Sequence, residues 1–289
     1  MIKFETFQIF QQFPKLQHYI GTKELLFRPP QYIDSENVAS IQKSISRIQE
    51  QFSFKKIIFL AQIHSAHVEI ITENNKDQMH FADAAITNLK DISLNVAVAD
   101  CVPLLVYDSQ HDIIAVIHAG WKGSKGNITR KTLELMQQEF ASNAEYFWVG
   151  IGPAICGNCY KVGKEVAKHF PEDFSRKEKK KHFFERIHYI FGSFFFHCIR
   201  KDRNMHRCAK KFCRFFQRII KYLTEFHLTP PQKYFLDLRA VNKQELLDFG
   251  IPENQIEISH ECTFESPEKY FSYRRTAEKA NFVCGIGMR

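Results

Sequence analysis

The chain has 289 residues, of which 44% are hydrophobic and 25% are charged, and its formal net charge is +8. It is long for one domain and has ample length to bury a sizeable core. The N-terminal stretch MIKFETFQIFQQF lacks the continuous apolar run of a signal peptide, and the longest apolar run, Ile187–Ile199, is too short to cross a bilayer. The eight cysteines are typical of reduced thiols or ligands, so we expect a cytoplasmic protein with no membrane partner.

Strand-like runs are the most frequent pattern along the chain. They predict strands at Lys56–Ile63, Val68–Thr72, Ala84–Thr87, Val96–Ala99, Val102–Tyr107, Ile113–His118, Glu145–Ile151, Tyr234–Leu238, QIEIS and NFVCGIGM. Helices are predicted from the N-cap Asn127 through ITRKTLELMQQEF, in VGKEVAKHF, and in NKQELLDF before Gly250. Because strands outnumber helices, we predict an α/β (α+β) fold with mixed sheets in a layered sandwich and helices outside.

One basic segment interrupts this pattern, and we predict a single domain, residues 1–289, with an insertion at about 172–230. Arg176–Lys221 contains fifteen Lys and Arg residues and three acids, a net charge of +12 against −4 for the remaining residues. We favour an insertion packed by its phenylalanines with a solvated cationic face, and contact with nucleic acid or a membrane surface is the alternative. A zinc knuckle is disfavoured because no standard finger spacing fits His197, Cys198, His206, Cys208 and Cys213.

The hairpin within 96–124 carries a potential metal ligand on each of its two strands, at the end away from the turn. If Ser109 and Gln110 form a two-residue turn, Cys101 lies directly opposite His118, with Cβ atoms about 4.5–5.5 Å apart. Such a pair suits two ligands of one metal ion, and a buried free cysteine beside a core histidine is the alternative.

A third ligand is available in AQIHSAHV, which offers both His64 and His67 after another strand-like run. Two histidines and one thiolate leave one position of a tetrahedral zinc ion open, as in catalytic zinc sites. An ion held in this way lowers the pKa of its bound water and polarises a substrate group.

Seven ordered segments connect these residues to a known family. They are QIHS, ADAAIT, VADCVPLLVYD, HAGWKG, GIGPAICGNCYKVGKEV, YFLDLRAVNKQELLDFGI and CTFESPEKYFSYRR. The chain resembles, over roughly Phe54–Tyr160 and Tyr234–Arg275, the laccase-domain family of purine nucleoside phosphorylases. That family was formerly described as multicopper polyphenol oxidases and includes proteins linked to peptidoglycan editing. The resemblance implies that His64, Cys101 and His118 bind the metal, and so it favours His64 over His67.

The resemblance also implies a zinc-dependent enzyme that cleaves adenosine, inosine or guanosine with phosphate and deaminates adenosine. Cys101 and His118 would serve catalysis through the metal. Asp83 of ADAAIT is the candidate acid or base, with a turn or capping carboxylate as the alternative. Lys122, Arg274 and Arg275 are candidates for binding phosphate, and a structural ion pair is the alternative for one of the arginines. We expect a monomer or a homodimer.

Other interpretations remain. Cys156 and Cys159 have the spacing of a redox pair, but only Cys159 matches the family pattern, so we interpret the spacing as accidental. One Cys and two His also suit copper and polyphenol oxidation, although a multicopper oxidase needs more histidines. A peptidoglycan-precursor hydrolase would use Cys101 as nucleophile and His118 as base. A non-catalytic protein would bind its partner through the basic segment.

Overall fold

The computed structural model describes residues 4–28, 35–178 and 232–289. It divides into two units, the first comprising Met1–Arg176 with Phe235–Arg289 and the second Lys177–Tyr234. Most of the basic segment, including the disfavoured zinc knuckle, lies outside the described residues. Among the described helices, none is both long enough and apolar enough to cross a membrane.

Strands dominate the described structure, as predicted. The strands are β1 (Leu16–Ile20), β2 (Lys56–Phe59), β3 (Val68–Ile70), β4 (Ala84–Thr87), β5 (Ile92–Val98), β6 (Val102–Asp108), β7 (Ile113–Ala119), β8 (Phe147–Ile151), β9 (Lys161–Gly163), β10 (Ser175–Lys177), β11 (Lys233–Leu236), β12 (Ile256–Ile258) and β13 (Phe282–Met288). The α-helices are α1 (Ser35–Phe52), α2 (Trp121–Lys125), α3 (Ile128–Phe140), α4 (Lys164–Ala167), α7 (Leu238–Phe249) and α8 (Tyr273–Thr276). Short 3-10 helices are η1 (Gln8–Phe10), η3 (Ala144–Tyr146) and η4 (Glu253–Gln255).

Two large sheets are mixed, which confirms the predicted fold class. The four-stranded sheet has the order β1-β13-β5-β2, and the six-stranded sheet has the order β12-β8-β6-β7-β4-β3. Each combines antiparallel pairs, such as β13 with β5 and β6 with β7, with parallel pairs, such as β2 with β5 and β12 with β8. A smaller sheet has the order β10-β11-β9.

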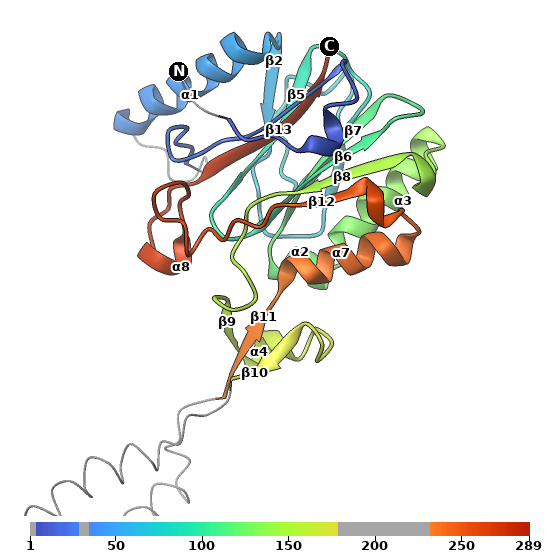
Figure 1. The fold of residues 1–289 in the computed structure, drawn as a ribbon. Helices are drawn as coiled ribbons and strands as arrows, with labels where there is room; N and C mark the ends of the chain where they lie inside the picture. Colours follow the sequence, from blue (N-terminus) through green and yellow to red (C-terminus); the bar gives the residue numbers. More distant parts are fainter. Residues whose placement is uncertain (1–3, 29–34, 179–231) are drawn as a thin grey trace, which may run out of the picture. The chain divides into compact units, whose positions relative to one another are not determined.

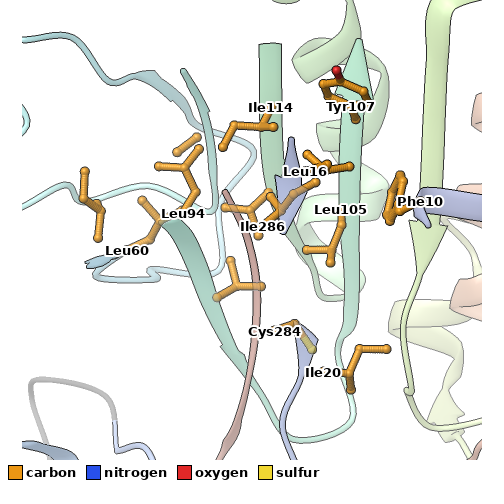
Figure 2. Packing of buried hydrophobic residues seen from close by; sticks show 14 of the residues in the cluster. Phe10, Leu16, Ile20, Leu60, Leu94, Leu105, Tyr107, Ile114, Cys284 and Ile286 are labelled. Atoms are coloured by element: carbon orange, nitrogen blue, oxygen red, sulfur yellow. The ribbon is translucent and has the colours of Figure 1, made fainter. Parts of the chain in front are cut away.

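The main core lies between the two large sheets. Leu94 of β5 and Ile286 of β13 pack into the same cluster as Leu105 of β6 and Ile114 of β7, and all four are buried (Figure 2). Because side chains alternate along a strand, the residue next to each of these four on its own strand faces the opposite way, toward the helices. This arrangement fits the long apolar runs of the sequence, since β5, β6 and β7 are buried on both faces.

The helices cover the outer faces of the sheets. Ile48 and Phe52 of α1 pack with Tyr19 of β1 and Val283 of β13 on the outside of the four-stranded sheet. Helices α3 and α7 lie side by side against the six-stranded sheet (Figure 1), joined by a hydrogen bond of 2.7 Å between Thr129 and Asn242.

The structure adds elements that the sequence analysis did not predict and changes the details of two predicted helices. Helix α1 and strand β1 were not predicted, and α4 is shorter than the predicted VGKEVAKHF helix. Helix α3 does begin after Asn127, but this residue has a left-handed backbone (φ 58°) and its side chain makes no capping bond. Asn127 lies in the short connection between α2 and α3, and asparagine adopts the positive φ of this connection more readily than most residues do.

The predicted register of the hairpin was also wrong. Asp108 pairs with Ile113, so the turn contains four residues, and Pro103 rather than Cys101 lies opposite His118. The Asp108 carboxylate accepts hydrogen bonds from the amides of Gln110 and His111, which stabilises the longer turn.

Strands β10 and β11 reach the two ends of the undescribed segment 179–231. Within the second unit, the amide of Glu178 donates to the carbonyl of Lys233 at 2.9 Å. The Gln232 side chain donates to the Glu178 carbonyl at 2.9 Å. The described residues on either side of that segment, Glu178 and Gln232, therefore lie next to each other.

Candidate metal centre

Three side chains converge at one end of the space between the large sheets. The potential ligand atoms of His64, Cys101 and His118 all lie within 4.8 Å of one another. The two imidazole rings have their centroids 4.9 Å apart and are almost perpendicular. The structure thus brings together the three residues that the sequence proposed as ligands.

Strand geometry explains why Cys101 and His118 meet despite the different register. In the observed hairpin, Pro103 lies opposite His118, so Cys101 is its diagonal neighbour on the same face. This face also carries Leu105 and Val116, which point toward the four-stranded sheet. The cysteine and histidine therefore continue the inward-facing rows of β6 and β7 to the end of the sandwich.

The third residue, His64, is held by a buried carboxylate. Its own backbone is left-handed (φ 55°), and its amide donates to Asp83 at 3.0 Å. The amide and hydroxyl of Ser65 also donate to Asp83, at 2.6 and 2.8 Å. His67 is exposed, as His64 is, but its ring lies 3.2 Å from the carboxylate of Glu69 and does not belong to the cluster.

The same carboxylate orients His118. Nδ1 of His118 lies 2.8 Å from Asp83, whose side chain is fully buried, and this bond leaves Nε2 for a cation. Partners of this kind fix the tautomer and orientation of metal-binding histidines. Because Asp83 lies behind His118, its contacts favour a positioning role over direct proton transfer to a substrate.

Gly120 leaves room for the close approach of the candidate ligands. A Cβ atom at this position would lie 3.0 Å from Sγ of Cys101 and 3.5 Å from the His64 ring. Its backbone conformation is ordinary (φ −75°), so the requirement comes from space and not from strain. Any side chain here would press on the atoms that face the cation.

The electrostatics of the cluster couple the thiol to the imidazole. Burial raises the pKa of the Cys101 thiol, but the charge of His118 and hydrogen bonds from both histidines outweigh it and lower this pKa to about 6. Burial lowers the pKa of His118, but Cys101 and Asp83 raise it to about 9. Each residue thus favours the charged form of the other, a thiolate at Cys101 and an imidazolium at His118.

A cavity of about 460 Å³ opens beside the cluster, within the range of small-ligand sites. Its lining includes the three candidate ligands together with Trp121, Tyr160, Tyr273 and Arg274. The guanidinium of Arg274 lies 5.0 Å from the Tyr160 ring, and Nη1 donates to the Lys161 carbonyl at 2.8 Å. The wall thus combines aromatic faces with a cationic group.

The other two proposed anion-binding residues do not line this cavity. Lys122 is exposed, and its ammonium lies 5.9 Å from the Trp121 ring, which does line it. Arg275 instead donates to the backbone carbonyls of Thr263, Phe264 and Tyr270 at 2.6–2.9 Å. These contacts favour a structural role for Arg275.

Sequence reasoning missed the role of Asp100, which lies next to Cys101. Its backbone has φ 90°, an uncommon value for a residue other than glycine. One carboxylate oxygen accepts from the Thr263 hydroxyl at 2.6 Å, and the other accepts from the Arg274 amide at 2.7 Å. Asp100 therefore joins the candidate metal centre to helix α8, which carries Arg274. The Ala-Asp-Cys motif was its only sequence signal.

The donor set fits a zinc ion. One thiolate and two imidazoles are ordinary zinc ligands, and three protein ligands leave a fourth position open. A donor set of this composition also binds copper, so the residues alone do not select the metal.

The fold and this cluster define a mixed α/β protein with a candidate catalytic metal centre. The chain belongs to the family described as multi-copper polyphenol oxidoreductase laccase, whose model matches residues 32–191 and 205–288. This result confirms the resemblance that the sequence motifs indicated.

Related proteins carry enzyme names. A Bacteroides thetaiotaomicron protein named purine nucleoside phosphorylase is 30% identical over 76% of this chain, and the match spans 66% of its own length. Adenosine deaminase RL5, from an unknown prokaryotic organism, is 29% identical over 76% of this chain and 70% of its own. The crystal structure of the hypothetical protein YfiH from Bacillus licheniformis superposes with a TM-score of 0.75 and 19% identity, covering 100% of this chain and 97% of that one. The last likeness concerns the fold alone.

Proposed function

We propose that this protein is a zinc-dependent purine nucleoside phosphorylase that also deaminates adenosine. The names of the relatives support this class of enzyme, and the donor set supports the metal. The substrates would be adenosine, inosine or guanosine, together with phosphate in the phosphorolytic reaction.

His64, Cys101 and His118 would hold the zinc ion, and Asp83 would keep His118 in the tautomer that leaves Nε2 for it. The bound ion would supply a Lewis acid and lower the pKa of a water molecule beside the substrate. The remaining residues of the centre then have to position the purine and the phosphate.

The residues that line the cavity are the observation that supports this proposal most directly. Trp121, Tyr160 and Tyr273 present aromatic faces on which a purine base can stack, and Arg274 offers guanidinium donors to an anion. These groups line the same cavity of about 460 Å³ as the three candidate ligands. A planar base, an anion and a metal-activated group can therefore meet in one space.

Product analysis tests the proposal. The zinc-loaded chain should convert inosine to hypoxanthine and ribose 1-phosphate only when phosphate is present, and adenosine to inosine without it. Arg274→Ala should slow phosphorolysis about ten- to a hundredfold, as expected when a charged hydrogen bond worth about 1.5–3 kcal/mol is lost. No turnover of any purine nucleoside by zinc-loaded protein would refute the proposed function.

The role of Lys122 can be tested with a matched control on the same short helix. Lys122 lies outside the cavity but beside Trp121, which lines it, so it can contact only a phosphate that extends past Trp121. In that case Lys122→Ala should weaken phosphorolysis and leave deamination unchanged, whereas Lys125→Ala, which removes another exposed lysine of α2, should change neither. Equal losses of both reactions in Lys122→Ala would remove its phosphate role.

One observation favours a second candidate, a peptidoglycan-precursor hydrolase. Cys101, His118 and Asp83 form a chain of nucleophile, base and orienting carboxylate, the arrangement used in covalent acyl transfer. The two candidates predict opposite responses to metal. Chelation should abolish the nucleoside reactions, whereas added zinc should inhibit hydrolysis by a free Cys101 thiolate.

A further inference from the structure

A second group of metal-ligating side chains lies in two other loops of the first unit. The loop after β8 carries Cys156 and Cys159, and the loop between β12 and α8 carries Cys262 and Glu265. One ligand atom from each of the four residues lies within 4.8 Å of the other three. The Cys-x-x-Cys spacing, interpreted as accidental from the sequence, therefore forms half of a four-residue cluster.

Backbone hydrogen bonds explain how the two loops present these side chains. The amides of Cys159 and Tyr160 donate to the Cys156 carbonyl, at 2.9 and 3.0 Å, so the Cys-x-x-Cys segment forms a tight turn. The amides of Glu265 and Ser266 donate to the Cys262 carbonyl in the same way, at 3.1 and 2.9 Å.

The two turns are held together by a bridge between Ala154 and Cys262, in which the Thr263 amide donates to the Ala154 carbonyl at 3.2 Å. This pairing joins residues that are more than 100 positions apart in the chain. The cluster therefore joins two paired segments of the first unit and does not belong to a single loop.

The side chains of the cluster face one another. The thiol of Cys159 donates to Glu265 at 3.3 Å, and that of Cys156 approaches the other carboxylate oxygen at 3.9 Å. Sγ of Cys262 accepts from the Cys156 amide at 3.3 Å. All three cysteines are free thiols, and Cys262 is buried.

We propose that Cys156, Cys159, Cys262 and Glu265 bind a second zinc ion. Tetrahedral zinc with sulfur ligands at about 2.3 Å holds its ligand atoms about 3.8 Å apart, so the four atoms need to shift by no more than about 1 Å. Three thiolates favour zinc over magnesium or calcium, and four protein ligands leave no open position. The site is therefore structural.

The ion would fix the wall of the cavity. Tyr160, which lines the cavity, follows Cys159 directly, and Thr263 follows Cys262. Thr263 holds Asp100, which in turn holds the amide of Arg274. Loss of this zinc should raise KM for the nucleoside more than it lowers kcat. This consequence rests on the proposed function, whereas the binding of zinc does not.

Zinc counting by difference tests the site in the full chain. Each protein is stripped with a chelator, reloaded with excess zinc and desalted before its zinc is counted. The Cys262→Ser and Cys159→Ser variants should each contain one zinc ion fewer per chain than the wild type. Cys284→Ser is the matched control, because it removes a buried thiol of β13 outside both clusters, and it should bind as much zinc as wild type. Cys101→Ser should lose one equivalent, and the Cys101→Ser/Cys262→Ser double variant should lose two.

Cobalt(II) distinguishes the two centres by their thiolates. Its sulfur-to-metal charge-transfer band should fall about three times as much in Cys262→Ser as in Cys101→Ser, since three thiolates face one ion and one faces the other. Wild-type zinc content in Cys159→Ser and Cys262→Ser would overturn the proposal. A Cys156–Cys159 disulfide in the zinc-loaded protein, found by mass spectrometry after alkylation, would overturn it too. These measurements need no substrate, so they remain decisive if nucleoside turnover fails.

Discussion

Replacement of Asp83 by asparagine should weaken metal binding without removing a ligand. The carboxylate accepts four hydrogen bonds, from the amides of His64 and Ser65, the Ser65 hydroxyl and Nδ1 of His118. An amide of the same shape has one oxygen and one NH2 group. It can keep His64 and His118 on its oxygen and donate to the Ser65 hydroxyl, but its NH2 group then faces the Ser65 amide.

The expected magnitude follows from this count. One buried donor is left unsatisfied, which destabilises the metal-free protein by about 1–3 kcal/mol. The neutral amide also polarises His118 less than a carboxylate does, and loss of such a partner typically weakens metal binding about 10- to 100-fold. Asp83→Asn should therefore reduce both the free energy of unfolding and the zinc affinity.

Asp108→Asn is the matched control. Asp108 is equally buried and also accepts from two amides and a histidine ring, but it lies at the opposite end of β6 from Cys101. Urea unfolding in the presence of a chelator measures stability, and competition with a chromophoric chelator measures zinc affinity. The control should lose stability and keep its affinity. Unchanged affinity in Asp83→Asn, or an equal loss in Asp108→Asn, would refute the positioning role.

Three further predictions concern other parts of the chain. Gly120→Ala should weaken zinc binding at least tenfold in the same competition assay, because its Cβ would crowd Cys101 at 3.0 Å; unchanged affinity would contradict the packing argument. Burial raises the pKa of Glu245 to about 7, so the wild type should lose stability as pH rises from about 4.5 through 7. Compared with the wild type, Glu245→Gln should therefore have a free energy of unfolding larger by about 1–2 kcal/mol at pH 8, a value reduced because Glu245 is partly exposed, and no larger at pH 4. Urea unfolding at the two pH values measures this difference. Trimming the chain between about Lys177 and Lys221 should leave nucleoside turnover within an order of magnitude, because no active-site motif lies there; complete loss in a folded variant would contradict this.

The meeting of Cys101 and His118 in the candidate metal centre was predictable because side chains alternate between the two faces of a strand. The assumed turn was two residues too short, yet Cys101 and His118 still meet, since an offset of two positions preserves the face of a strand. An offset of one would have placed the two side chains on opposite faces. The choice of His64 over His67 needed the family resemblance, because both follow the same strand and only the fold directs His64 to the other ligands.

The remaining features depend on contacts that local sequence does not contain. The Cys156–Cys159 spacing was interpreted as accidental because only Cys159 matches the family pattern. Its neighbours Cys262 and Glu265 lie more than 100 residues away in the sequence and are brought to it by a backbone bridge, which local sequence does not reveal. Likewise, the sequence could not separate a proton-transferring Asp83 from a positioning one. That distinction depends on burial behind His118, which is a property of the packed structure.

The neighbouring ends of β10 and β11 make the chain between them a natural place for protein engineering. Since Glu178 and Lys233 are hydrogen-bonded to each other, any polypeptide that joins them starts and finishes at nearly one point. Closing such a loop becomes harder by only about 0.6 kcal/mol for each doubling of its length. A fluorescent reporter or an affinity module could therefore be exchanged for residues 179–231 without a change elsewhere in the chain.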